Sequence, residues 1–211
     1  MIGVQPVSPS YWTRARRALS RSDAVMAAII AANPRVRLRS RGDPFQTLAR
    51  SIVGQQISVK AADSIWARVV AAAPGMHPEA VLALRKPRLR RAGLSVRKAE
   101  YLRDLARHFV ERTLHVHRWP HMDDEAIIDE LTAVRGIGRW TAEMFLIFNL
   151  MRPDVLPVDD LGLRRAVALH YRDGDPIGAR ELREFGSAWA PWRSVATWYL
   201  WRSLDPVPVE Y

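Results

Sequence analysis

Three features of this sequence predict an all-α fold. The fold would form either one large domain or two small lobes that share a cleft. Apolar residues recur at the three- and four-residue spacing of amphipathic helices almost throughout, whereas alternating, strand-like runs are nearly absent. Residues typical of helix starts and helix ends separate these periodic segments. A hydrophobic content of 48% over 211 residues is enough to form a sizeable core.

The expected helices begin and end at capping residues, in order along the chain. Helix starts are indicated at Ser22-Asp23, before an Ala- and Ile-rich run, at Asp43-Pro44, and at Ser95. Helix ends are indicated at Asn33-Pro34, Pro74-Gly75 and Gly93. Two further helices should meet within residues 124–150, and another should follow residue 160. The first dozen residues and the segment from Asp205 to Tyr211 are expected to be loosely held tails.

The strongly basic composition favours a polyanionic partner. Lys and Arg number 32 against 22 Asp and Glu, which gives a formal net charge of +10 and a pI near 10.9. Nucleic acid is favoured over an anionic membrane surface. Most of the basic residues are Arg, whose planar group suits phosphates, although a GC-rich genome would produce the same bias.

The Cys and His content limits metal and redox chemistry. The chain has no cysteine, which excludes disulfides, Cys-ligated zinc and an iron–sulfur cluster. His115 and His117 flank Val116 in a turn-like segment, where exposure to solvent is a better explanation than metal binding. No signal peptide or apolar run of transmembrane length is found, so we expect a soluble, cytoplasmic protein that does not bind membranes.

Residues 131–142, Leu-Thr-Ala-Val-Arg-Gly-Ile-Gly-Arg-Trp-Thr-Ala, are the most informative segment. Two helices should meet at the turn formed by Gly136, Ile137 and Gly138. Such a turn lets the backbone approach a phosphate closely, while the N–H groups and the dipole of the second helix attract the anion. An ordinary helical hairpin is the alternative. The full twelve-residue pattern, with Ile137 as an inward plug, favours a phosphate-binding hairpin.

Two adjacent carboxylates, Asp159 and Asp160, follow the hairpin by about twenty residues, in a loop that leads into a helix. One of them could simply cap that helix. Alternatively, a carboxylate placed there could face a cleft beside the hairpin. An ionised carboxylate stabilises the cation-like sugar formed when a glycosidic bond breaks, and it can orient or deprotonate the attacking water. One carboxylate is sufficient when the leaving base already carries a positive charge.

Three segments, in this order, resemble the helix-hairpin-helix DNA glycosylase superfamily. They are the hairpin, the loop Pro157-Val158-Asp159-Asp160, and Trp189-Ala-Pro-Trp-Arg-Ser194. The pattern runs from about Asp43 to Arg202 and most resembles 3-methyladenine DNA glycosylase II, in a short form without the N-terminal β-rich domain. The resemblance implies one glycosylase unit over residues 1–211 with a central cleft. Lobe A would comprise residues 44–160, with the hairpin at 124–150, and lobe B residues 1–43 and 161–211.

The same resemblance implies a catalytic role and a substrate pocket. Asp160 matches the catalytic carboxylate, and Asp159 is its neighbour of lesser role. Trp140 occupies the position of the Schiff-base lysine of bifunctional relatives, so its ring would instead stack on a cationic flipped base. Leu161 replaces the family's tyrosine, which leaves the substrate range open. The predicted pocket residues are Trp140, Trp201, Leu161 and Gln55, whereas Trp189 and Trp192 are expected in the core.

The resemblance also implies a set of DNA contacts. Gln56 would be the wedge that fills the gap left by the extruded nucleotide, although adjacent glutamines on an exposed helix face are the alternative. No metal bound by side chains and no other cofactor is expected, apart from a monovalent cation on the main-chain carbonyls of Thr132, Val134 and Ile137. The predicted DNA-binding residues are Gln56, Gly136, Ile137, Gly138, Arg139 and Thr141.

The function implied is that of a monomeric, monofunctional base excision repair enzyme that acts on double-stranded DNA. It would flip an alkylated base, hydrolyse the N-glycosidic bond and leave an abasic site. A bifunctional glycosylase with lyase activity on other lesions is one alternative, which the absent lysine and cysteines oppose. A noncatalytic DNA-binding protein, in which Asp160 only caps a helix, is another. The preferred alkylbase is not predicted.

Overall fold

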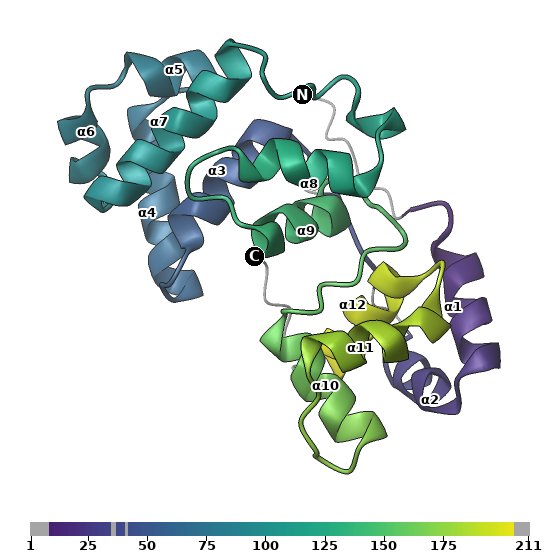
Figure 1. Cartoon of the computed structure of the whole chain (residues 1–211). Helices are drawn as coiled ribbons and strands as arrows, with labels where there is room; N and C mark the ends of the chain where they lie inside the picture. The colour runs from purple at the N-terminus through teal and green to yellow at the C-terminus, as the bar shows by residue number, and fades with distance from the viewer. Residues whose placement is uncertain (1–8, 35–36, 41, 205–211) are drawn as a thin grey trace. The chain divides into compact units, whose positions relative to one another are not determined.

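The structure is a computed structural model that describes residues 9–34, 37–40 and 42–204 (Figure 1). Within these residues all regular secondary structure is helical, which confirms the predicted all-α fold class. Two compact units make up the chain. Unit 1 contains the described residues up to Ser40 and from Leu146 onward, and unit 2 contains the residues between them. None of the helices described is both long and apolar enough to cross a membrane.

Unit 1 is built from helices near both ends of the sequence. Large side chains fill its core, among them Trp12, Met26, Trp189 and Tyr199. Asp23 caps α2 as predicted, because its Oδ1 accepts the N–H of Met26 at 2.9 Å. The helices of this unit are α1 (Trp12–Ser22), α2 (Ala24–Ala32), α10 (Leu161–Tyr171), α11 (Ala179–Phe185), the 3-10 helix η2 (Gly186–Trp189) and α12 (Arg193–Leu204).

The Asp23 carboxylate also joins segments that are far apart in the sequence. Its Oδ2 accepts the hydroxyl of Tyr171 at 2.7 Å and the indole N–H of Trp189 at 3.1 Å. Burial, followed by the bond to Asp23, raises the pKa of the Tyr171 hydroxyl, so this group stays a neutral donor. One carboxylate therefore connects α2 with α10 and η2.

Unit 2 is arranged around α7, which packs against α3, α5 and α6. Asp43 and Ser95 cap α3 and α7 as predicted, with Gln46 and Lys98 as the respective N–H donors. The helices that begin in this unit are α3 (Pro44–Gly54), α4 (Val59–Ala72), α5 (Pro78–Ala83), α6 (Lys86–Arg91), α7 (Val96–Val110), η1 (Trp119–His121), α8 (Asp124–Thr132) and α9 (Arg139–Phe148).

The boundary of the units differs from the lobes proposed on the sequence, because residues 146–160 group with unit 1 rather than with the middle of the chain. Their partners explain this. Tyr11 donates its hydroxyl to the carbonyl of Met151 at 2.7 Å, and Arg193 pairs with Asp154 at 2.7 Å. Phe148 stacks on Trp201, with ring centroids 5.9 Å apart.

The expectation of a loose N-terminal tail is wrong for the described residues 9–12. Trp12 begins α1 and is buried, and the Tyr11 ring stacks on Trp192 with centroids 5.8 Å apart. Aromatic burial holds this segment, a contribution that its sequence position alone does not reveal. The rest of the proposed tails, residues 1–8 and 205–211, lies outside the described residues.

Candidate functional site

The helix-hairpin-helix segment forms as the sequence predicts, with α8 and α9 joined by residues 133–138. Ile137 is buried in the turn, and its N–H donates to the carbonyl of Val134 at 3.1 Å. Gly136 has a φ of +87°, and a Cβ atom there would lie 2.2 Å from the Tyr101 ring. Glycine is therefore required at this position for both backbone and packing reasons. Gly138 is exposed, and a Cβ atom there would meet nothing within 4 Å, so the turn is open at this point.

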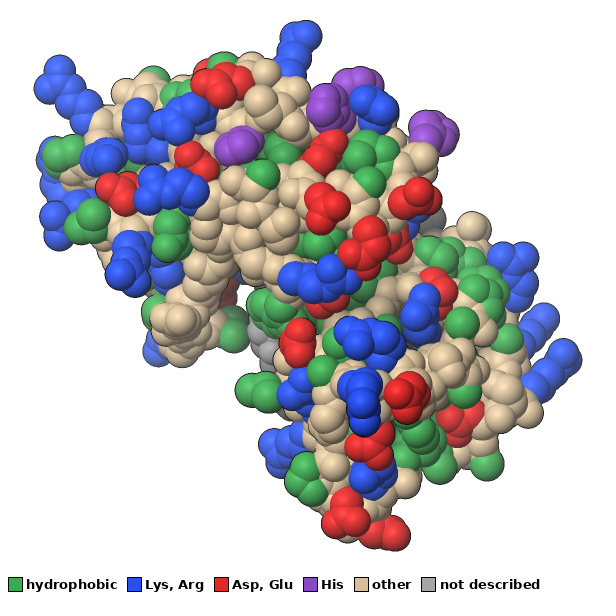
Figure 2. Space-filling view, viewed as in Figure 1, with side chains coloured by type: hydrophobic (Ala, Val, Ile, Leu, Met, Phe, Trp, Pro, Cys, Tyr) green, Lys and Arg blue, Asp and Glu red, His purple; other side chains and the backbone are tan. Residues whose placement is uncertain are grey.

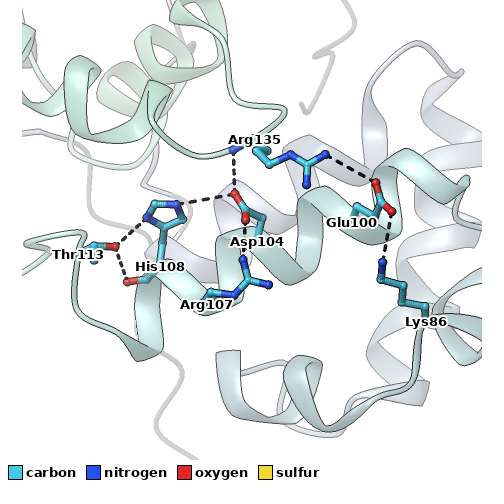
Figure 3. Close-up of polar contacts among 7 residues, drawn as sticks. All are labelled: Lys86, Glu100, Asp104, Arg107, His108, Thr113 and Arg135. Carbon is cyan, nitrogen blue, oxygen red and sulfur yellow. Dashed lines mark hydrogen bonds and ion pairs between the residues drawn. The ribbon is translucent and has the colours of Figure 1, made fainter.

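Asp104 of α7 is hydrogen-bonded to the backbone of the hairpin. It is a buried carboxylate whose Oδ2 accepts the main-chain N–H of Arg135 at 3.0 Å, while Oδ1 accepts from Arg107 at 3.0 Å (Figure 3). His108 lies 3.7 Å from the same Oδ2 and also contacts Thr113. Sequence reasoning missed Asp104, although an acidic residue on the apolar face of a predicted helix is a signal that could have identified it.

Of the predicted DNA-binding side chains, one is paired within unit 2 and another is buried. The Arg139 guanidinium donates to Glu125 at 2.9 Å and to Glu143 at 3.1 Å, and its bonds to Glu125 raise its pKa further. The side chain of Thr141 is buried. A phosphate contact from the Arg139 guanidinium would compete with these carboxylates, whereas main-chain N–H groups at the start of α9 would not.

The carbonyl of Val134 already accepts the N–H of Ile137. A carbonyl oxygen has two lone pairs, so this bond leaves one for a cation. The monovalent cation expected on the carbonyls of Thr132, Val134 and Ile137 stays a prediction.

His115, considered above as a metal ligand, instead contacts Glu130 through Nδ1 at 2.6 Å. Among the described residues no group of three or more His, Asp or Glu side chains could hold a metal ion.

The two adjacent glutamines lie in the turn after α3, which we call the glutamine turn (residues 54–57). Gln55 caps the C-terminus of α3 and donates its side-chain amide to the carbonyl of Gly136 at 2.8 Å, so it links this turn to the hairpin. Gln56 is exposed and has a φ of 56°. Gln55 was expected in a substrate pocket, but its amide contacts the hairpin.

Sequence reasoning missed Lys98, which holds the glutamine turn from the first turn of α7. Its ammonium donates to the carbonyl of Gln55 at 2.6 Å and to that of Val53 at 2.8 Å. Burial lowers the pKa of this amine. No local signal marks the residue, because its partners lie more than forty positions away in the sequence.

Asp160 is held in a fixed orientation in unit 1. It caps α10, because its Oδ1 accepts the N–H of Leu163 at 2.6 Å, and the same oxygen accepts the indole N–H of Trp201 at 2.8 Å. The Trp201 ring stacks on Phe148 with an interplanar angle of 16°. The Asp160 carboxylate therefore caps α10 and also accepts a second hydrogen bond, from Trp201, that fixes its orientation.

The residues next to Asp160 differ from it in their surroundings. Asp159 is exposed and pairs with Arg164 at 2.9 Å. Leu161, expected in the pocket, is 77% exposed. Gly162 packs closely, since a Cβ atom there would lie 3.2 Å from the Asp160 Oδ1 and 3.3 Å from the Trp201 ring. Of residues 159–162, only Asp160 accepts a hydrogen bond from an aromatic side chain.

The remaining predicted aromatic residues take different positions. Trp140 lies in the first turn of α9, in unit 2, and is 38% exposed. Trp189 is in the core as expected. Trp192 is half-buried between Tyr11 and the guanidinium of Arg14, which lies 5.1 Å from its ring centroid.

Basic side chains gather on unit 2 around α6 (Figure 2). No Asp or Glu occurs between Glu79 and Glu100. Lys86 pairs with Glu100, which also lies 3.7 Å from Arg135. The exposed basic residues of this segment are Arg85, Lys86, Arg88, Arg90, Arg91 and Arg97. Such a concentration of positive charge suits phosphate groups.

Comparison with known proteins identifies related sequences. A family model described as HhH-GPD superfamily base excision DNA repair protein matches residues 49–191. DNA-3-methyladenine glycosylase 1 of Schizosaccharomyces pombe is 33% identical over 172 residues, which are 79% of this chain and 75% of that protein. YfjP of Bacillus subtilis is 34% identical over 169 residues, 76% of this chain and only 59% of that protein.

Solved structures give the same result. A DNA-3-methyladenine glycosidase from Bacillus halodurans superimposes with a TM-score of 0.84 and 36% identity, covering 96% of this chain and 93% of that chain. The 3-methyladenine DNA glycosylase Mag1 of Schizosaccharomyces pombe, in complex with abasic DNA, has a TM-score of 0.81 and 28% identity, covering 94% and 98%. Because a family model spans most of the sequence, and the hairpin and the capping carboxylate of Asp160 are both present, the chain belongs to the HhH-GPD superfamily of base excision DNA repair proteins.

Proposed function

We propose that the chain is a monofunctional DNA glycosylase of the DNA-3-methyladenine type, which removes alkylated bases from double-stranded DNA. The observation that carries this proposal is the Asp160 carboxylate, oriented at the start of α10 by the N–H groups of Leu163 and Trp201. A carboxylate fixed before the reaction stabilises a developing positive charge without the cost of reorganisation. Relatives named DNA-3-methyladenine glycosylase, one of them solved with abasic DNA, support the choice of substrate.

The reaction begins with a flipped nucleotide, because the glycosidic carbon is out of reach in stacked duplex DNA. The bond between that carbon and the base nitrogen breaks, and the electron pair leaves with the base and neutralises its positive charge. The sugar becomes cation-like and is stabilised by Asp160. Water adds to the sugar carbon and passes a proton to the Asp160 carboxylate, which later releases it to solvent, so the products are a free alkylbase and an abasic site.

The proposed enzyme leaves the DNA strand intact. Strand cleavage by bifunctional glycosylases needs an amine that forms a Schiff base with the sugar. The position implied for that amine is Trp140, whose indole cannot form one. Its partly exposed ring is instead suited to stack on an electron-poor base.

DNA would be held mainly through its phosphates. The open turn at Gly138, the first main-chain N–H groups of α9 and the basic residues around α6 offer contacts without sequence preference. Binding should then weaken steeply as salt is added, because each neutralised phosphate releases counterions.

Release of free methylated bases from alkylated duplex DNA tests the proposal. Wild type should release bases without nicking the strand. Asp160→Asn should bind DNA but release bases at least about a hundredfold more slowly. Asn is as good a helix cap as Asp, so this substitution separates chemistry from capping. Asp159→Asn is the matched control, since it makes the same change one residue away on an exposed side chain, and it should retain activity.

The capping geometry of Asp160 favours one other function, that of a noncatalytic DNA-binding protein. In that case neither wild type nor Asp160→Asn would release bases, while both would bind DNA equally. Strand nicking by wild type without added base would instead indicate a lyase and would contradict the role given to Trp140.

A further inference from the structure

The glutamine turn has a backbone conformation that a glutamine does not favour. Gln55 has φ −54° and ψ 130°, and Gln56 has φ 56°. These are the first three angles of a type II turn, in which the position of Gln56 normally requires glycine or asparagine. A side chain with positive φ costs free energy and persists only when its surroundings impose it.

Lys98 supplies that restraint. Type I and type II turns differ mainly in the orientation of the central peptide, here the one that links Gln55 to Gln56. The carbonyl oxygen of that peptide is the one that the Lys98 ammonium contacts at 2.6 Å. The second contact, at 2.8 Å to the carbonyl of Val53, fixes the ammonium at the end of α3. A cation in this place selects the type II conformation and therefore the direction of the Gln56 side chain.

The same face of α7 also fixes the hairpin. Lys98, Tyr101 and Asp104 follow one another at intervals of three residues, so they lie along one side of the helix. Tyr101 lies against Gly136, and Asp104 accepts the N–H of Arg135. Gln55 completes the connection by donating to the carbonyl of Gly136. The glutamine turn and the hairpin are thus aligned by one helix.

We propose that Lys98 is a positioning residue for base extrusion, which holds the carbonyl of Gln55 so that Gln56 is presented as the wedge. This inference rests on the proposed function, because it concerns the flipping step that precedes hydrolysis. Lys98 itself contacts neither the base nor the sugar. Its effect should be greatest when the lesion is paired and stacked, since the wedge then offsets the loss of pairing and stacking.

Single-turnover base release by the full chain tests this, with two DNA substrates. One carries a methylated base in a matched pair, and the other carries it opposite an abasic-site analogue, where extrusion is easier. Lys98→Met keeps the length of the side chain and removes the ammonium. It should slow release from the paired substrate about tenfold, the scale set by one strained backbone position. Release from the unpaired substrate should stay within about twofold of wild type.

Lys60→Met is the matched control, because it removes one exposed positive charge from α4 of unit 2 and leaves Lys98 and the basic residues around α6 unchanged. It should leave the ratio of the two release rates unchanged. Lys98→Arg keeps a cationic donor and should lose less than Lys98→Met. Circular dichroism at the assay temperature ensures that folded protein is compared. Equal slowing of both substrates by Lys98→Met, or no slowing of either, would overturn the inference.

A second readout separates this inference from the proposed function. The fluorescence of 2-aminopurine placed beside an abasic-site analogue reports insertion of a wedge without any hydrolysis. Wild type and Lys60→Met should raise the fluorescence on binding, and Lys98→Met should raise it much less. If wild type releases no base but this difference is found, the proposed activity is wrong and the role of Lys98 stands. An equal rise in all three proteins contradicts the role of Lys98 whatever the activity.

Discussion

The Asp160 carboxylate shows how one side chain can combine a structural and a chemical role. Its Oδ1 accepts two N–H groups, one from the backbone of α10 and one from the indole of Trp201. Both bonds restrict the rotation of the carboxylate. The Phe148 ring, stacked on Trp201, in turn fixes the donor. The stacked rings of Phe148 and Trp201 therefore help to orient the Asp160 carboxylate, which we propose stabilises the sugar cation.

Trp201→Phe tests the part of this orientation that depends on the indole N–H. Phenylalanine keeps an aromatic ring against Phe148 but cannot donate to Asp160. We expect base release to slow by on the order of tenfold, which corresponds to about 1.4 kcal/mol for a hydrogen bond to a charged group. DNA affinity should change little. The measurement is single-turnover release alongside a binding titration, and an unchanged release rate would show that capping alone orients Asp160.

At the scale of elements, α7 and the hairpin form a connected structure in which the buried Asp104 is central. Removing its carboxylate leaves the N–H of Arg135 without its acceptor, which costs about 1–3 kcal/mol when the group is buried. Asp104→Ala should therefore lower stability and speed hydrogen exchange of the main-chain amides in residues 133–138. Arg107→Ala is the control, because it removes only a half-exposed ion pair to the same carboxylate. Equal exchange rates in the two variants would contradict the role of Asp104.

Glu130 of α8 should make the stability of this region depend on pH. Burial acts to raise its pKa, but hydrogen bonds from Trp119 and His115 outweigh burial and hold the pKa below its ordinary value. A carboxylate whose pKa is lower in the folded state stabilises the fold above its unfolded pKa, and this contribution is lost as the pH falls through the folded pKa. Between about pH 6 and about pH 3, Tm should thus fall more in wild type than in Glu130→Gln. Parallel Tm curves would contradict this.

The sequence predicts local features of these elements far better than distant ones. The caps Asp23, Asp43 and Ser95 were recognised because a cap and its N–H donor lie three residues apart. The inward plug Ile137 was recognised from its place between two glycines. Lys98, Asp104 and the amide of Gln55 were missed or assigned elsewhere, because their acceptors or donors lie 31 to 81 positions away in the sequence.

At the scale of the whole molecule, the all-α class followed from periodicity, whereas the division into units did not. Residues 146–160 carry no signal that assigns them to unit 1, because that assignment depends on partners such as Tyr11 and Arg193. Likewise, the sequence identifies Asp23 as a cap but does not reveal its bonds to Tyr171 and Trp189. Contacts of this kind decide how the two ends of the chain form one unit.

A pair of variants measures that contribution. Asp43→Ala removes a helix cap alone and should cost about 1 kcal/mol of unfolding free energy. Asp23→Ala removes a cap and also leaves the Tyr171 hydroxyl and the Trp189 N–H without their acceptor, so it should cost about 2–4 kcal/mol. Urea titration followed by circular dichroism compares the two. A cost for Asp23→Ala no greater than that for Asp43→Ala would mean that the long-range bonds contribute nothing.

The composition of unit 1 from both ends of the chain has a consequence for synthesis on the ribosome. The described residues of unit 2 are continuous in sequence, so all of them are available once residue 145 has left the exit tunnel. The segment with α1 and α2 emerges before unit 2 but must wait for Tyr171, Trp189 and α12, which are translated after unit 2. During that interval Trp12 lacks Tyr199 of α12, on which its ring stacks. A nascent chain stalled before η2 should therefore leave the apolar faces of α1 and α2 uncovered, the kind of surface that chaperones bind.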